Sequence, residues 1–110
     1  MIVKEVKAII QPFMLNQVLE ALTEIPGAPG ITISHLQGLG GMPASGHDDL
    51  IEPAPRVKLE MVVPDSLVEQ VVQTIAARAH TGNSGDGKIF VSAVEEVVKI
   101  RTGQRGEGAI

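Results

Sequence analysis

The sequence contains no cysteine, tryptophan or tyrosine, and its two phenylalanines, Phe13 and Phe90, account for an aromatic content of only 2%. The lack of cysteine excludes disulfide bonds, cysteine-based zinc ribbons and thiol catalysis. So few aromatic rings also exclude a platform on which nucleic-acid bases would stack. The core must therefore be built from aliphatic side chains and methionine.

An excess of positive charge is also missing. Lysine and arginine number 9 against 13 aspartate and glutamate, which gives a net charge of −4 and argues against a general nucleic-acid binder. No apolar run approaches membrane-spanning length, and the first residues lack the apolar region of a signal peptide. With 110 residues and 44% hydrophobic content, we expect a single domain over residues 1–110, cytoplasmic and without membrane insertion.

The first half of the chain reads as one β-α-β unit. Residues 6–10 form a β-branched run and predict a strand. Residues 14–25 place apolar side chains at helical spacing, and the proline and glycine residues at 26–30 end that helix. Residues 31–39 alternate between apolar and polar side chains, as a strand does.

The second half repeats the pattern. It predicts a strand at 57–63, a helix from Asp65 that is capped by a Ser66–Glu69 capping box, a returning strand at 89–91 and a short strand at 96–101. Two such units favour an α+β fold, the ferredoxin-like βαββαβ sandwich, with an antiparallel sheet and two helices on one face. Because the strands carry apolar residues on both sides, we expect the uncovered face to mediate self-association.

The halves are joined by residues 38–55, which are rich in glycine and proline and too numerous for a plain hairpin turn. We expect residues 41–55 to form a flexible arm. Within it, His47, Asp48 and Asp49 could bind a divalent cation, whereas the simpler interpretation is a solvated acidic loop. Of the other histidines, His35 is interpreted as a packing or interface residue, and His80 as a favourable cation at a helix end.

The most informative segment runs from the second helix through three glycines to Lys88 and then into a strand. Backbone N–H groups in such a turn can converge on a phosphate, with the lysine as a mobile cation at its rim. The same composition is also typical of an ordinary tight connection, and local chemistry alone does not separate the two interpretations.

Four motifs occur in order: Ala-Ile-Ile-Gln-Pro-Phe at 8–13, Val-Lys-Leu-Glu-Met-Val-Val-Pro-Asp at 57–65, Thr-Gly followed by Gly-Asp-Gly-Lys-Ile-Phe-Val within 81–91, and Arg-Thr-Gly through Ala-Ile at 101–110. In these motifs the chain resembles the PII signal-transduction family over almost its whole length. The resemblance implies a homotrimeric, non-enzymatic regulator that binds ATP or ADP between subunits. It also implies that the flexible loop carries the signal to a protein partner, either a membrane transporter or a metabolic enzyme.

The resemblance also implies the binding residues. Phosphates would lie against Gly85, Asp86, Gly87 and Lys88, adenine between Ile9 and Val62, base and ribose against Thr32 and Glu60, and the loop base would contribute Gly38 and Gly40. Lys99 and Arg101 would reach in from the neighbouring subunit, Arg56 would replace a lysine, and the segment of about 102–110 would cover the cleft.

Several departures from the family pattern indicate a divergent PII-like branch with a shortened loop. Met42 replaces a glutamine that helps to coordinate magnesium and 2-oxoglutarate, and Gln11 replaces a lysine near that ligand. We therefore expect weak 2-oxoglutarate binding, an uncertain role for magnesium, and an adenylate (ATP, ADP or AMP) as the effector. Without tyrosine, uridylylation of a loop tyrosine is impossible.

Two other function classes remain open. An enzyme would need rigidly held acids or nucleophiles, but most candidate residues lie in the expected flexible arm. A metal-binding or metal-tolerance protein linked to cation efflux would use His47, since cysteine ligands are absent.

Overall fold

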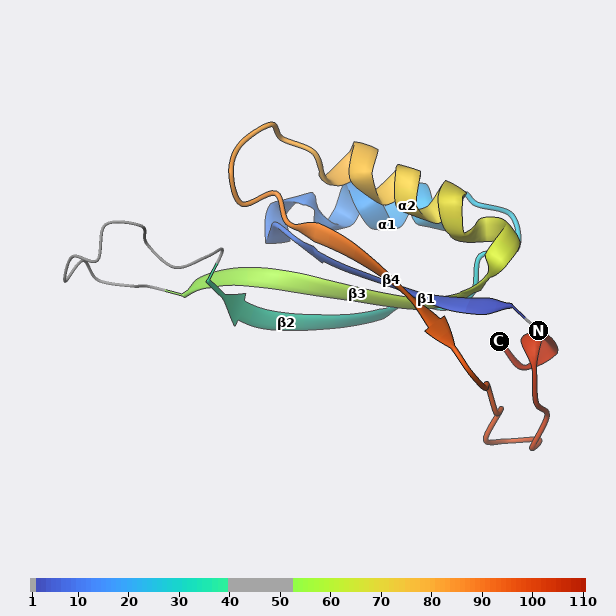
Figure 1. Cartoon of the computed structure of the whole chain (residues 1–110). Coiled ribbons are helices and arrows are strands. Elements are labelled where there is room, and N and C mark those ends of the chain that lie inside the picture. The colour runs from blue at the N-terminus through green and yellow to red at the C-terminus, as the bar shows by residue number, and fades with distance from the viewer. Residues whose placement is uncertain (1, 40–52) are drawn as a thin grey trace.

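The structure, a computed structural model, describes residues 2–39 and 53–110. It comprises β1 (Val3–Ile10), a 3-10 turn η1 (Pro12–Met14), α1 (Leu15–Thr23), β2 (Thr32–Gly38), β3 (Ala54–Pro64), α2 (Asp65–Ala79), β4 (Lys88–Val94) and η2 (Glu107–Ala109). The strands form one sheet in the order β2-β3-β1-β4, and every neighbouring pair is antiparallel. Both helices cover the same face of the twisted sheet (Figure 1). The predicted ferredoxin-like α+β fold is thus confirmed.

The core lies between this sheet face and the helices. Side chains alternate between the two faces of a strand, so every second residue of the central strands is buried. The buried set includes Val6, Ala8 and Ile10 of β1, Val57, Leu59, Met61 and Val63 of β3, Val18 and Leu22 of α1, and Val71 and Ile75 of α2. A slip of one residue in the β1–β3 register would move all of these strand side chains to the open face, and their burial therefore fixes the register.

The face that the helices leave open is mixed in character, so the expectation of an apolar face was wrong in part. Lys7 Nζ lies 3.9 Å from a carboxylate oxygen of Glu5, and Lys58 Nζ lies 3.4 Å from one of Glu60. The register places Phe90 opposite Lys7 on this face, and Phe90 is 51% exposed. Ion pairs and exposed apolar groups therefore share the surface.

The predicted capping box at the start of α2 is absent. Pro64 occupies the cap position without a side-chain hydrogen bond, because β3 leads directly into the helix and Ser66 falls inside the first turn. In a capping box the Glu69 carboxylate would accept a hydrogen bond from the Ser66 N–H. Here it accepts one from Gln73 Nε2 instead, at 2.9 Å. Asp65 stabilises the helix start, since its carboxylate lies in the first turn and 3.4 Å from Lys4 Nζ.

The predicted strand at 96–101 is also wrong. Residues 97–106 fold back on themselves through a single bridge between Val98 and Arg105, with the Lys99 N–H donating to the Gln104 carbonyl at 2.8 Å. An ion pair between Glu96 and Arg105 supports this bend. Ile100, at its tip, is 99% exposed, and within residues 2–39 and 53–110 the segment that suggested a strand pairs with none of the named strands. We call residues 97–106 the C-terminal hairpin.

The C-terminal hairpin extends from one end of the sheet, close to the N-terminus, whereas the glycine-rich connection from α2 to β4 lies at the other end (Figure 1). Among the described residues, no helix has the length and apolar character that crossing a membrane requires.

Candidate functional site

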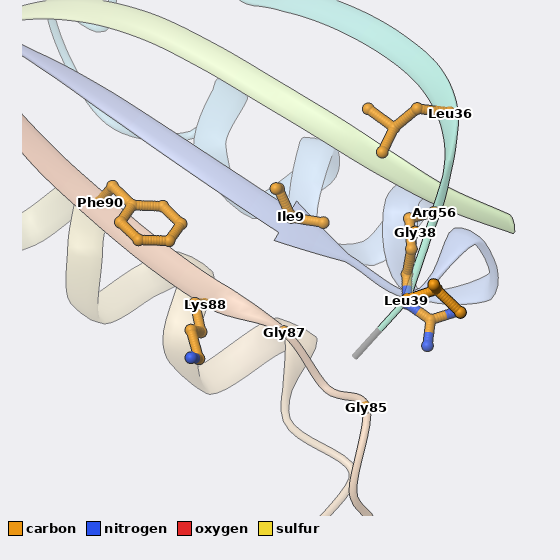
Figure 2. A pocket seen from close by; sticks show the side chains of 9 residues that line it. All are labelled: Ile9, Leu36, Gly38, Leu39, Arg56, Gly85, Gly87, Lys88 and Phe90. Carbon is orange, nitrogen blue, oxygen red and sulfur yellow. The ribbon is translucent and has the colours of Figure 1, made fainter. Parts of the chain in front are cut away.

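A cavity of about 320 Å³ lies beside the glycine-rich connection, on the open face of the sheet (Figure 2). It is lined by Ile9, Leu36, Gly38, Leu39, Arg56, Gly85, Gly87, Lys88 and Phe90. Six of these residues were predicted to bind nucleotide: Ile9, Gly38, Arg56, Gly85, Gly87 and Lys88. The structure therefore brings together residues from all four strands and from the turn before β4.

The antiparallel sheet explains why these residues meet. β1 and β2 end at the same end of the sheet at which β3 and β4 begin. The register there sets Ile9 opposite Lys88 and Leu36 opposite Arg56. Arg56 and Lys88 flank Ile9 on either side (Figure 2). Two cations around an apolar floor suit a ligand that combines an anionic group with a less polar one.

Only glycine fits at position 87 in this backbone geometry. Its φ is +103°, and a Cβ placed on it would lie 1.7 Å from the carbonyl oxygen of Ile9. The turn therefore lies directly against the β1 backbone, at a distance that only a residue without a side chain permits.

The Asp86 side chain is directed back into the turn, and Asp86 does not line this cavity. Its Oδ2 accepts hydrogen bonds from the N–H groups of Thr81 at 2.8 Å and Gly82 at 3.0 Å, and its Oδ1 accepts one from the Thr81 hydroxyl. The Thr81 hydroxyl, followed by the Thr81 N–H, lowers the pKa of Asp86 below its ordinary value of 3.8. Asp86 closes the turn, and the sequence pattern gave no sign that Thr81 is its partner.

We expect the Asp86→Asn variant to be less stable than the wild type at neutral pH, because an amide cannot accept both N–H bonds as strongly as a carboxylate does. A lowered pKa in the folded state stabilises the protein fully above the unfolded pKa, and this contribution is lost as the pH falls through the folded value. The stability difference between the two proteins should therefore be constant at neutral pH and shrink below about pH 4. Urea denaturation across pH 3–7 measures it, and a difference that is independent of pH would contradict this role.

Of the residues predicted for base and ribose, Ile9 lines this cavity, whereas the other three lie elsewhere. Thr32, Glu60 and Val62 line a second hollow of about 360 Å³, together with Glu5, Pro29, Gly30 and Ile110. Thr32 and Glu60 are directly opposite in the β2–β3 register. Within one chain, Ile9 and Val62, the two residues predicted to flank adenine, thus border two separate hollows of the same sheet face.

Lys99 and Arg101 line neither hollow. They belong to the C-terminal hairpin, at the end of the sheet opposite the glycine turn (Figure 1). A single chain therefore does not bring these two cations to the turn.

Some predicted residues cannot be placed. Gly40, Met42 and the weak metal candidates His47, Asp48 and Asp49 lie outside the described residues. Within residues 2–39 and 53–110, no three histidine, aspartate or glutamate side chains gather as metal ligands would.

The sequence matches the family model described as "Nitrogen regulatory protein P-II" over residues 3–104. It is 49% identical to the nitrogen regulatory protein P-II of Azospirillum brasilense and 45% identical to nitrogen regulatory protein P-II 1 of Escherichia coli, in each case over 97% of this chain and 99% of the relative.

Among solved structures, Arabidopsis thaliana PII bound to citrate superposes with a TM-score of 0.83 at 40% identity, covering 99% of this chain and 92% of that one. Bacillus subtilis GlnK superposes with a TM-score of 0.86 at 31% identity, with both chains covered completely. The sequence and the fold thus both match these relatives over nearly the whole length of the chain.

Proposed function

The chain belongs to the nitrogen regulatory protein P-II family, and from this premise we propose that it binds adenine nucleotides between the subunits of a homotrimer and transmits their state to a protein partner. Membership makes it a regulatory signalling protein rather than an enzyme. The nucleotide, the trimer, the cytoplasmic location and the partner are the parts that we propose.

The observation that carries the proposal is the cavity beside the glycine turn. Its wall combines the backbone of Gly85 and Gly87 with the cations of Arg56 and Lys88. Several donors and cations that converge from separate segments are what a chain of phosphates requires. Ile9 and Leu36 supply an apolar surface next to this polar wall.

The placement of Lys99 and Arg101 supports a shared site. Both residues belong to the C-terminal hairpin, which lies far from the glycine turn of its own chain (Figure 1). They flank Ile100, which is fully exposed. An exposed aliphatic side chain between two cations suits packing against another subunit, which would bring the cations to that subunit's nucleotide. With three subunits, as proposed, a closed ring of such contacts gives three equivalent sites.

Gly38, Leu39 and Arg56 line the cavity, and the predicted loop of residues 41–55 lies between them in the sequence, although its last two residues, Ala54 and Pro55, belong to β3. A nucleotide in the cavity would thus contact residues that precede and follow the loop. Binding can regulate a partner, either a transporter or an enzyme, only if the nucleotide has a different affinity for the two loop states.

Calorimetric titration of the purified protein with ATP, ADP and AMP, with and without magnesium, tests the proposal. We expect saturable binding of at least one adenylate, and little additional heat from 2-oxoglutarate because Met42 and Gln11 replace its expected ligands. Failure of all three adenylates to bind would overturn the proposed function.

A further inference from the structure

Gln11 directly follows β1, and its side chain reaches the glycine turn, 74 residues further along the sequence. Its Nε2 donates a hydrogen bond of 2.6 Å to the carbonyl oxygen of Gly85. From the sequence, Gln11 was interpreted only as the replacement of a lysine near 2-oxoglutarate. In the structure, its side chain makes this hydrogen bond to the glycine turn. A residue outside the turn thus holds one of the two turn glycines, Gly85 and Gly87, that line the cavity.

Gly85 leaves little space on that side. Its φ is +94°, and a Cβ placed on it would lie 3.0 Å from Gln11 Nε2 and 3.3 Å from Arg56 Nη2. The amide of Gln11 and the guanidinium of Arg56 therefore both pack against Gly85. The absence of a side chain at Gly85 lets the amide approach its carbonyl oxygen.

The turn is held from two directions. Asp86 ties it to Thr81 and Gly82, at the end of α2, and Gln11 ties it to the end of β1. These two attachments involve adjacent residues, Gly85 and Asp86, which share one peptide group. In a trans peptide the C=O and N–H bonds point in opposite directions, so fixing the Gly85 carbonyl also fixes the direction of the Asp86 N–H.

We propose that Gln11 is a positioning residue for phosphate binding, which sets the orientation of the Gly85–Asp86 peptide before a nucleotide arrives. This inference rests on the proposed function. Donors that are already oriented lose less conformational entropy when a ligand binds. Because the amide is neutral, it orients the turn without adding charge, and the anion is left to Arg56 and Lys88.

The test compares Gln11→Met, which keeps the length of the side chain but has no donor, with Gln11→Lys, which restores an N–H donor. In the nucleotide-free protein, the backbone order parameter of the Asp86 N–H, measured by ¹⁵N relaxation, is expected to be lower in Gln11→Met than in the wild type, because the Gly85–Asp86 peptide loses the hydrogen bond that holds it. Gln11→Lys is expected to restore the wild-type order parameter. Measuring the order parameter without ligand separates the orientation of the turn from the charge of the lysine.

Calorimetry then compares ADP with adenosine on the wild type and Gln11→Met. Affinity for ADP should fall by about 5- to 10-fold in Gln11→Met while affinity for adenosine stays unchanged, because only the phosphates contact the turn. Wild-type ADP affinity of Gln11→Met, an unchanged order parameter at Asp86, or an equal loss for ADP and adenosine would each overturn the positioning role and leave the proposed function standing. Failure of the wild type to bind any of ATP, ADP and AMP would overturn both.

Discussion

Replacing Gly87 by alanine is expected to lower the free energy of unfolding by about 2–4 kcal/mol and to remove measurable nucleotide binding. The new Cβ would lie 1.7 Å from the Ile9 carbonyl oxygen, which belongs to the backbone of a central strand and cannot move aside alone. The φ of +103° adds strain for any residue with a side chain. The turn would have to leave β1, and the cavity wall would move with it.

Alanine substitutions at two further glycines distinguish the cost of the steric clash from the cost of a positive φ. Gly27 has a φ of +77° but no atom within 4 Å of a built Cβ, whereas Gly30 has neither a positive φ nor a close atom. Gly27→Ala should therefore cost about 1 kcal/mol, and Gly30→Ala close to nothing. Urea denaturation of all three variants at one protein concentration measures the series. A Gly87→Ala protein as stable as Gly27→Ala would show that the turn does not pack against β1 as described.

Lys88→Ala is expected to lower the affinity for ATP by about 10- to 100-fold, because hydrogen bonds between charged groups contribute about 1.5–3 kcal/mol. Lys88 begins β4 on the wall of the cavity, and no acidic side chain lies within ion-pair distance of its Nζ among the described residues. Its charge is therefore available to an incoming anion. Titration calorimetry at fixed ionic strength measures the change.

Lys4→Ala is the matched control for Lys88→Ala. Lys4 is also a strand lysine, but it pairs with Asp65 at 3.4 Å and does not line the cavity. Removing it takes away the same formal charge and should leave ATP affinity within about twofold of the wild type, since a charge beyond a Debye length is largely screened. Equal losses in both variants would mean that Lys88 acts through net charge and contacts no phosphate.

The fold was predictable because its elements have clear periodicity. The alternation in β3 and the helical stripe of α2 each point to one buried face, and two β-α-β units leave few arrangements. The strand predicted at 96–101 failed because alternating Val98 and Ile100 mimic a half-buried strand. Whether such a segment pairs depends on a neighbouring strand, which local sequence does not report.

The candidate site was predictable only in part. Glycines before Lys88 predict a turn, but the link from Gln11 to Gly85 spans 74 residues and has no local pattern. The role of Asp86 likewise depends on the direction of its side chain, which the fold decides. The division of the predicted binding residues between two hollows follows from the sheet register, and motif order does not reveal it.

Oligomers that combine two variant chains test most directly the proposal that each nucleotide lies between two subunits of a trimer. Lys88→Ala and Arg101→Ala chains, each purified alone, are expected to bind ATP poorly, because every site lacks one cation. When the two chains are mixed in equal amounts during refolding, random assortment should pair an intact Lys88 with a neighbour's intact Arg101 at about one quarter of the sites. Recovery of ATP binding at about that fraction, measured by calorimetry, would support a shared site. Wild-type binding by Arg101→Ala alone, or no recovery in mixed trimers, would contradict it.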